Sequence, residues 1–348
     1  MKPLRFAMLG AGFWAHYQLS AWQELEGVEC VALCDPIQEK AENLAHRHHV
    51  SRVYTDPESL LAHERLDFVD IVTPPETHAA LVTLLLAHRI PTICQKPMAT
   101  SYADAEKLVA AAKSANVPFF IHENFRWQKP FRALKAALEQ KRIGRPFRAR
   151  LECITGYPTF VMQPALKELE QFILADLGSH ILDMARCLFG EASSLYCQTA
   201  RVHPDIRGED AATVMLRMNS TMVMVHLAEA ETPLENDPLF QTLVFIEGEK
   251  GSLELGLDYR VRETTAEGTF VKRFAPEARP WMHPDYLLVQ SALIPCNADL
   301  LAGLQRRKSP ETTAEDNLKT MQLVFSSYES ARTDSVIHFA HTEKGKLT

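Results

Sequence analysis

Short apolar runs alternate with helix-length segments over the first 120 residues of this 348-residue chain. The apolar runs are predicted to form buried strands at residues 4–10, 28–35, 68–73, 92–94 and 118–122. The segments between them predict helices at residues 13–24, 76–88 and 102–114. Strands separated by helices require parallel crossovers, so we predict an α/β domain with a doubly wound parallel sheet at residues 1–123.

The pattern changes after residue 124. Helices are predicted at residues 130–142, 174–189 and 314–332, and strands at 145–155, 210–230, 240–256 and 335–339. Glu247–Gly251 reads as a hairpin turn. Residues 124–348 are therefore expected to form an α+β domain around one large, mostly antiparallel sheet, with substrate-binding and oligomerisation roles.

The segment Thr221–Leu227 is apolar at nearly every position, whereas a half-exposed strand alternates apolar with polar residues. Either a partner subunit covers one face, as in a homo-oligomer (dimer or tetramer), or the strand is buried within one chain. The pattern leaves both open.

The composition of the chain limits the classes of function that it can have. Hydrophobic residues make up 46% and charged residues 23%, which is ordinary for a globular protein, and the length suits two domains. A net charge of −7 argues against a nucleic-acid or anionic-membrane partner. We expect no signal peptide and no apolar run long enough to span a bilayer. The seven scattered cysteines predict free thiols in a reducing cytoplasm and no metal site.

A glycine pattern lies at the first strand-to-helix turn, in Gly10-Ala11-Gly12-Phe13-Trp14-Ala15. Gly10 permits the tight turn, Gly12 lets a pyrophosphate approach the backbone, and Ala15 lets the helix pack closely on the sheet. The free N–H groups of the helix N-terminus would face the phosphates. This is the pattern of a dinucleotide-binding Rossmann domain.

Asp35 ends the next strand, in Cys34-Asp35-Pro36. Its carboxylate would accept hydrogen bonds from an adenosine ribose and repel a 2′-phosphate. We therefore predict NAD as the cofactor, with NADP less favoured.

Further motifs follow later strands. Thr73-Pro74-Pro75-x-x-His78 comes after a central strand, where a nicotinamide would lie. Gln95-Lys96-Pro97 places a lysine at the tip of the next strand. Asp176-Leu177-Gly178-Ser179-His180 puts an aspartate and a histidine at i and i+4, on one face of a predicted helix, with Asp183 positioned to support the imidazole. Taken singly, each also reads as a surface or packing feature.

In this order, and with Asn124-x-Arg126, the motifs resemble the glucose–fructose oxidoreductase / inositol dehydrogenase / MocA family over essentially the whole chain. The family's usual Glu-Lys-Pro is Gln95-Lys96-Pro97 here, which removes a carboxylate near the cofactor. The resemblance implies a Rossmann domain that carries NAD and a second domain that holds a sugar or polyol. Cofactor contacts are predicted at Gly10, Gly12, Phe13, Trp14, Asp35, Thr73, Pro74, His78, Gln95 and Lys96.

The same resemblance implies that Lys96, Asp176 and His180 face the substrate carbinol. We favour His180 as the general base because its base form is populated near neutrality. Lys96 would stabilise negative charge on the substrate oxygen, and Asp176 would orient the sugar. The opposite assignment, with Lys96 as base, stays open.

Polar and aromatic residues near the predicted cleft suit an unphosphorylated sugar. Besides the three catalytic residues, the predicted substrate contacts are Asn124, Arg126, Trp127 and Gln163, and a cluster of Trp281, His283 and Tyr286 would close the pocket. Packing alone is an equal explanation for Trp127.

His122-Glu123-Asn124 together with Phe172–His180 looks like the D-apiose dehydrogenase branch of the family, which implies oxidation of that sugar to its lactone. The alternatives are a dehydrogenase of another aldose or an inositol, a non-catalytic sugar-sensing regulator, and an NAD-using glycosidase. The glycosidase is disfavoured because no ligand cluster accompanies the motifs.

Overall fold

The computed structural model of the protein describes residues 2–156, 158–229 and 242–339, which form parts of two compact units. Unit 1 comprises Met1–Trp127 and Glu277–Met321, and unit 2 comprises Gln128–Pro276 and Gln322–Thr348. The predicted domains, 1–123 and 124–348, differ from this division, because residues 277–321 return to unit 1. The reason is packing, since Cys296 and Leu300 lie in the unit 1 core.

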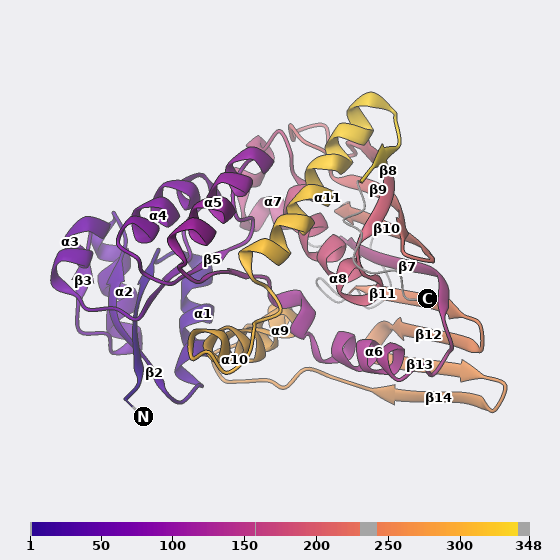
Figure 1. Cartoon of the computed structure of the whole chain (residues 1–348), viewed down its shortest axis with the longest axis horizontal. Helices are drawn as coiled ribbons and strands as arrows, with labels where there is room; N and C mark the ends of the chain where they lie inside the picture. The colour runs from indigo at the N-terminus through magenta and orange to yellow at the C-terminus, as the bar shows by residue number, and fades with distance from the viewer. Residues whose placement is uncertain (1, 157, 230–241, 340–348) are drawn as a thin grey trace. The chain divides into compact units, whose positions relative to one another are not determined.

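Unit 1 is built on a six-stranded sheet with the order β3-β2-β1-β4-β5-β6 (Figure 1). All its neighbouring strands pair in parallel. The strands are β1 (Leu4–Leu9), β2 (Val28–Cys34), β3 (Val53–Tyr54), β4 (Phe68–Ile71), β5 (Thr92–Gln95) and β6 (Phe119–His122). Successive strands are added toward one edge of the sheet from β1 to β3 and toward the other edge from β4 to β6, so the switch point lies between β1 and β4. Doubly wound sheets bind ligands at this switch point, at the carboxyl ends of their strands.

Helices connect these strands and complete unit 1. They are α1 (Phe13–Gln23), α2 (Gln38–His48), α3 (Pro57–His63), α4 (Pro75–Ala87), α5 (Tyr102–Ala115), η1 (Asn124–Trp127), η5 (Pro284–Tyr286), α9 (Leu287–Ser291) and α10 (Leu293–Leu304). The doubly wound sheet predicted from the apolar runs is confirmed. Phe6 and Phe68 stack at 4.8 Å between ring centroids on neighbouring strands, and Trp22 packs against both.

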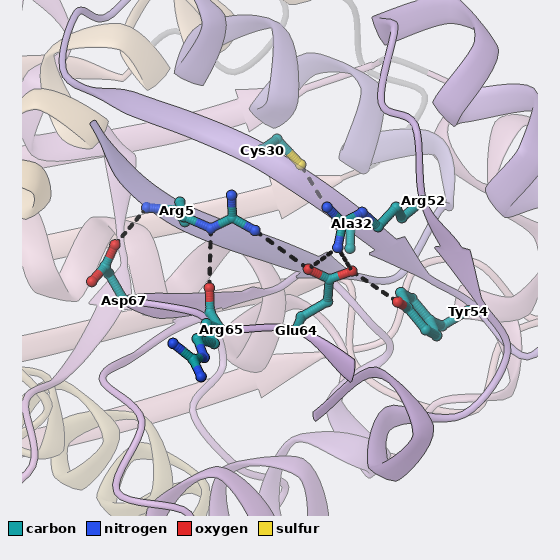
Figure 2. A network of polar contacts seen from close by, with 8 residues as sticks. All are labelled: Arg5, Cys30, Ala32, Arg52, Tyr54, Glu64, Arg65 and Asp67. Atoms are coloured by element: carbon teal, nitrogen blue, oxygen red, sulfur yellow. Dashed lines mark hydrogen bonds and ion pairs between the residues drawn. The ribbon is translucent and has the colours of Figure 1, made fainter. Parts of the chain in front are cut away.

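A buried carboxylate ties together several segments at the amino ends of these strands (Figure 2). Glu64, which follows α3, accepts hydrogen bonds from the Arg52 guanidinium at 2.6 and 2.8 Å and from the Tyr54 hydroxyl at 2.8 Å. Arg5 on β1 donates to the same carboxylate at 3.4 Å, and its backbone N–H donates to Asp67 at 2.7 Å. Arg5 lies near the start of β1, whereas the glycine turn follows the end of that strand. We therefore assign this network to stability.

Unit 2 contains a nine-stranded sheet with the order β14-β13-β12-β11-β7-β10-β9-β8-β15. Only β7 and β10 pair in parallel within this sheet as described. The strands are β7 (Pro146–Thr155), β8 (Ala192–Ala200), β9 (Ala211–Met218), β10 (Thr221–Glu229), β11 (Leu243–Gly248), β12 (Gly251–Gly256), β13 (Arg260–Thr265), β14 (Gly268–Arg273) and β15 (Ile337–His338). The predicted α+β architecture with a mostly antiparallel sheet is confirmed.

The helices of unit 2 are fewer among the residues that the structure describes. They are α6 (Lys129–Glu139), α7 (Thr159–Met162), η2 (Pro164–Glu168), the π-helical turn η3 (Leu174–Gly178), α8 (Ser179–Phe189), the short η4 (Leu257–Tyr259) and the later part of α11 (Ala314–Thr333).

The strand predicted at residues 210–230 is in fact a hairpin of β9 and β10, which turns at Asn219. Asn219 has φ of 51°, a left-handed conformation that asparagine tolerates. The hairpin turn predicted at Glu247–Gly251 is confirmed between β11 and β12, since Gly248 pairs with Gly251.

The two faces of β10 differ in exposure. Val223, Val225 and Leu227 are buried, whereas Met222 and Met224 are 46% and 37% exposed. The alternative of a strand buried on both faces within one chain is therefore wrong. The outer face of β10 therefore exposes apolar side chains to solvent, and Met215 on the neighbouring strand β9 is also 52% exposed.

One described stretch, Pro284–Leu304, is long and apolar enough by length and composition to cross a membrane. This corrects the expectation that none exists. The most apolar 18-residue part of this stretch is 56% buried inside the protein, and Leu293 and Leu300 within the stretch are fully buried. These features are those of a core helix.

Candidate functional site

The glycine turn between β1 and α1 has the geometry that a dinucleotide needs. Gly10 has φ of 100°, and a Cβ there would lie 2.5 Å from the Val72 carbonyl oxygen, so glycine is required. Gly12 has open space around its Cβ position, which leaves room for a ligand against the backbone. Ala15 is fully buried, as the close packing of helix on sheet predicts.

The first turn of α1 fits a pyrophosphate. Gly12 is the N-cap and supplies no side-chain hydrogen bond to the helix, and the first turn contains no acidic residue. The N–H groups of this turn and the positive end of the helix dipole thus suit an anion. Phe13 is 56% exposed and packs edge-on against Tyr286, with 5.9 Å between ring centroids. Trp14 lies near Tyr17, with 6.0 Å between the rings.

Asp35 also braces the glycine turn. One carboxylate oxygen accepts the Ala11 N–H at 2.8 Å, and the other accepts the Ile37 N–H at 2.9 Å. A carboxylate has about four lone-pair sites, so further acceptor capacity remains for ribose hydroxyls. The predicted ribose contact of Asp35 stays a prediction, and its bracing of the turn had not been predicted.

His78 links the two loops that would flank a nicotinamide. Its ring is fully buried, with Nδ1 at 2.9 Å from the Pro97 carbonyl oxygen and Nε2 at 2.9 Å from the Thr73 carbonyl oxygen. Burial lowers the pKa of His78, while the two carbonyls oppose that shift. The side chain thereby holds the Thr73-Pro74 segment beside the cis Lys96–Pro97 peptide. Both ring nitrogens thus face protein carbonyls, and the cofactor contact predicted for His78 stays a prediction.

Gln95, where the family resemblance implies a glutamate, takes part in a network of side-chain contacts. Its side-chain Nε2 donates to Gln18 Oε1 and lies 3.2 Å from His122 Nδ1. His122 Nε2 lies 2.8 Å from Asn297 Oδ1, which assigns the proton to Nε2 and leaves Nδ1 as an acceptor. Both neighbours of Gln95 are therefore acceptors. A carboxylate would place a third acceptor between them.

Gln18 extends this network to a buried acid. Its Nε2 lies 2.8 Å from both oxygens of Asp70, and the Trp22 indole N–H donates to Asp70 at 2.7 Å. Burial raises the pKa of Asp70 to about 7, and these hydrogen bonds offset part of the rise. The chain of polar contacts thus runs from the loop of Lys96 into the core of unit 1.

Lys96 is half-buried directly after β5. Its charge acts on a second buried acid, Glu123. Glu123 is fully buried after β6 and accepts the Phe125 N–H at 3.3 Å. Burial raises the pKa of Glu123 to about 7, and the Lys96 ammonium is the largest opposing influence. Glu123 supplies a carboxyl near the lysine that position 95 lacks. The role of Glu123 beside Lys96 had not been predicted, although a glutamate directly after a buried strand was the available signal.

Three predicted sugar contacts in η1 are buried in unit 1. Asn124 donates to the Val289 carbonyl at 2.9 Å, and Arg126 pairs with Asp316 at 2.6 Å. Trp127 is 8% exposed and belongs to the hydrophobic core. These contacts give all three residues a structural role, and the sugar contact predicted for them stays a prediction.

In unit 2, Asp176 lies within the π-helical turn η3, and His180 lies in the first turn of α8. The predicted regular α-helix, with the two residues stacked at i and i+4, is therefore corrected. A π turn accommodates an extra residue and is frequent at functional sites. Asp176 is half-buried and His180 is 6% exposed. Asp183 lies 3.6 Å from the Arg186 guanidinium, and its support of His180 stays a prediction.

A further acid lies close to Asp176 in unit 2. Glu229 ends β10 and is 2% exposed. Burial raises the pKa of Glu229 to about 7, the nearby Thr159 side chain opposes this rise, and the Asp176 carboxylate reinforces it. No periodic pattern marks this residue, because it ends an apolar strand.

The remaining predicted residues range from exposed Gln163 and His283 to buried Tyr286. Gln163 is exposed between α7 and η2, and its contact with substrate stays a prediction. In unit 1, Trp281 donates to Glu24 at 2.9 Å, and the rings of His283 and Tyr286 lie 5.8 Å apart. Since Tyr286 also packs on Phe13, this cluster adjoins the glycine turn. Within the described part of the chain, no group of His, Cys, Asp or Glu side chains could hold a metal.

All seven cysteines are free, and five of them are buried. Burial raises the pKa of Cys34 and Cys197 to about 12, which makes these thiols poor nucleophiles. The predicted free thiols are confirmed.

The sheet order, the glycine turn and the acid after β2 define an NAD-binding oxidoreductase of the Rossmann type. Residues 4–123 match the model of the oxidoreductase family with an NAD-binding Rossmann fold, and residues 131–254 match the GFO/IDH/MocA C-terminal domain. The protein belongs to the GFO/IDH/MocA oxidoreductase family.

Relatives match it over nearly its whole length. It is 37% identical to a D-apiose dehydrogenase of Rhizobium rhizogenes over 95% of this chain and 96% of the relative. It is also 37% identical to a D-apiose dehydrogenase of Paraburkholderia graminis, over 99% of this chain and 92% of the relative. A crystal structure of an oxidoreductase from Agrobacterium radiobacter, in complex with NAD+, L-tartaric acid and magnesium, superimposes with a TM-score of 0.94. That protein is 36% identical, with 97% of this chain and 98% of that chain covered.

Proposed function

We propose that this dehydrogenase oxidises D-apiose at its anomeric carbon to the lactone, with NAD as acceptor. The observation that carries the proposal is the 37% identity with two D-apiose dehydrogenases over at least 95% of the chain. Identity with an inositol 2-dehydrogenase of Mycolicibacterium vanbaalenii is lower, at 26% over 80% of the chain.

NAD would be held by unit 1. The N–H groups of α1 and the space at Gly12 fit its pyrophosphate, and Asp35 fits its adenosine ribose. When bound, NAD supplies the acceptor for the hydride that leaves the carbinol carbon.

The chain's own residues manage the proton and the charge. His180 takes the proton of the substrate hydroxyl on a ring nitrogen as the C–H bond breaks, Lys96 stabilises the negative charge that develops on the oxygen, and Asp176 orients the sugar. Lys96→Arg separates this assignment from one with lysine as base, because arginine stays protonated and cannot accept a proton. Partial activity in that variant supports His180 as base. A loss as complete as in Lys96→Ala supports lysine.

A substrate panel tests the proposal. NADH formation is followed at equal concentrations of D-apiose, D-xylose, D-ribose, D-glucose and myo-inositol, with Lys96→Ala as the inactive control. We expect kcat/KM for D-apiose to exceed the others by at least about tenfold, the effect of one or two pocket contacts. A higher value for another sugar would overturn the substrate assignment. NAD binding without turnover on any sugar would favour a sugar-sensing regulator.

We also propose that the protein forms a homo-oligomer through the outer face of the unit 2 sheet. Met215, Met222 and Met224 make an exposed apolar row there, and a monomer gains nothing from leaving such side chains in water. Met224→Glu should shift the mass measured by light scattering toward that of one chain, 39.2 kDa. A wild-type mass of one chain at micromolar concentration would end this proposal.

The setting that we propose is a reducing cytoplasm, with no nucleic-acid or membrane partner. The free state of all seven thiols and the net charge of −7 support it. Cell fractionation with an antibody against the native protein tests the location.

A further inference from the structure

The backbone that leads into Asp176 is held by two side chains distant in sequence. Glu209 accepts the Leu174 N–H at 3.1 Å and the Phe172 N–H at 3.3 Å with its two carboxylate oxygens. The Tyr328 hydroxyl accepts the Ala175 N–H at 3.1 Å and donates to Glu209 at 2.8 Å. The backbone N–H groups of residues 172, 174 and 175, at the start of this helix, therefore bond to side chains from elsewhere in unit 2.

These contacts replace the usual helix cap. A helix begins with backbone N–H groups that have no partner within the helix, and a nearby side chain normally satisfies one of them. Here residue 173 supplies no side-chain cap to η3. The Glu209 carboxylate also lies at the positive end of the helix dipole, where a negative charge is favoured.

The backbone of Glu209 is fixed as firmly as its side chain. The Ile173 N–H donates to the Glu209 carbonyl at 3.1 Å. Gly208 precedes it, and a Cβ there would lie 2.7 Å from the Leu169 carbonyl oxygen, so only glycine permits this approach. The Tyr328 side chain comes from α11, which anchors the contact to a 20-residue helix.

We propose that Glu209 and Tyr328 are positioning residues that hold the π-helical turn, and through it the orientation of Asp176 and His180 toward the substrate. We call the contacts of Glu209 and Tyr328 with residues 172–175 the clamp. The π-helical turn lies between this clamp and α8, so its geometry depends on how its first residues are held. The consequence for turnover rests on the proposed function, whereas the clamp itself does not.

Tyr328→Phe tests the clamp, with Tyr196→Phe as a matched control. Both remove one hydroxyl in unit 2, but that of Tyr196 contacts Gln198 and Asp334 on the surface. We expect Tyr328→Phe to lower kcat about tenfold and to raise KM for the sugar, since small misplacements of reacting groups are costly. The dissociation constant for NAD should stay within twofold, because the predicted cofactor contacts lie in unit 1.

A purely stabilising role predicts a different result. Loss of folded protein would lower kcat and the number of NAD sites per chain in equal proportion, and it would leave KM for the sugar unchanged. That outcome, or equal kinetics for Tyr328→Phe and Tyr196→Phe, would overturn the proposal. Glu209→Gln combined with Tyr328→Phe should lose no more activity than the worse single variant, because the two act as one unit. Additive losses would count against the clamp.

Amide hydrogen exchange separates this proposal from the substrate assignment. The amides of residues 172–175 should exchange at least about fivefold faster in Tyr328→Phe than in Tyr196→Phe, because one hydrogen bond of about 1 kcal/mol is lost. This result is expected even if no tested sugar is oxidised. Unchanged exchange would refute the clamp even in an active D-apiose dehydrogenase.

Discussion

Asp70 gives the sharpest prediction for stability. Its carboxyl is fully buried, and burial raises its pKa from the ordinary value of 3.8 to about 7. A tenfold change in proton affinity is worth about 1.4 kcal/mol. The folded protein therefore binds this proton about 4 kcal/mol more tightly than the unfolded chain does.

The sign follows from linkage. Because the folded state holds the proton more tightly, the stabilisation is complete below pH 3.8, the ordinary pKa, and is lost as the pH rises through about 7. About 3 kcal/mol of it falls between pH 5 and pH 8. Asp70→Asn removes this titration and keeps an oxygen for the Trp22 N–H. The stability of the wild type minus that of the variant should fall by that amount over this pH range.

Urea unfolding followed by tryptophan fluorescence measures this difference. All four tryptophans, Trp14, Trp22, Trp127 and Trp281, lie in unit 1, so the signal reports on the unit that contains Asp70. Glu123 and Glu229, whose pKa values are also raised, are present in both proteins and cancel in the difference. A difference that changes by less than about 0.5 kcal/mol between pH 5 and pH 8, or that rises, would refute the reasoning.

Three further substitutions test the cofactor side of unit 1. Gly10→Ala places a methyl group against the Val72 carbonyl, and titration of protein fluorescence should show NAD binding weakened more than about tenfold; normal affinity would mean that the turn can yield. Asp35→Ala should reduce the preference for NAD over NADP in kcat/KM, and an unaltered ratio would mean that the ribose is recognised elsewhere. Gln95→Glu sets a carboxylate against two buried acceptors and should lower the free energy of unfolding by about 2–4 kcal/mol; wild-type stability in urea would contradict the donor role of this amide.

Local features of the fold were readable from the sequence. The glycine turn, Asp35 and five of the six parallel strands depend on residues close in the chain, and the predicted bounds of these strands agree with the structure to within a residue or two. The two-residue strand β3 was not predicted. The polar pair Asn219-Ser220 between two apolar segments was the available signal for the hairpin, which the prediction of a strand over residues 210–230 did not use.

Contacts between distant segments could not be read in this way. The ion pair of Arg126 could not be read from the sequence because its partner Asp316 lies 190 residues further along the chain. Tyr328 lies 119 residues from Glu209, and neither belongs to a motif. The π turn at Asp176 was taken as regular helix, since a π turn leaves the apolar periodicity on either side intact.

The most direct test of the account measures NADH formation from D-apiose and NAD binding on the same samples of wild type and Lys96→Ala. We predict steady turnover in the wild type, a loss of at least about a thousandfold in the variant, and NAD affinity that differs by less than about threefold. Equal turnover in both proteins would remove Lys96 from the chemistry and contradict the proposed site.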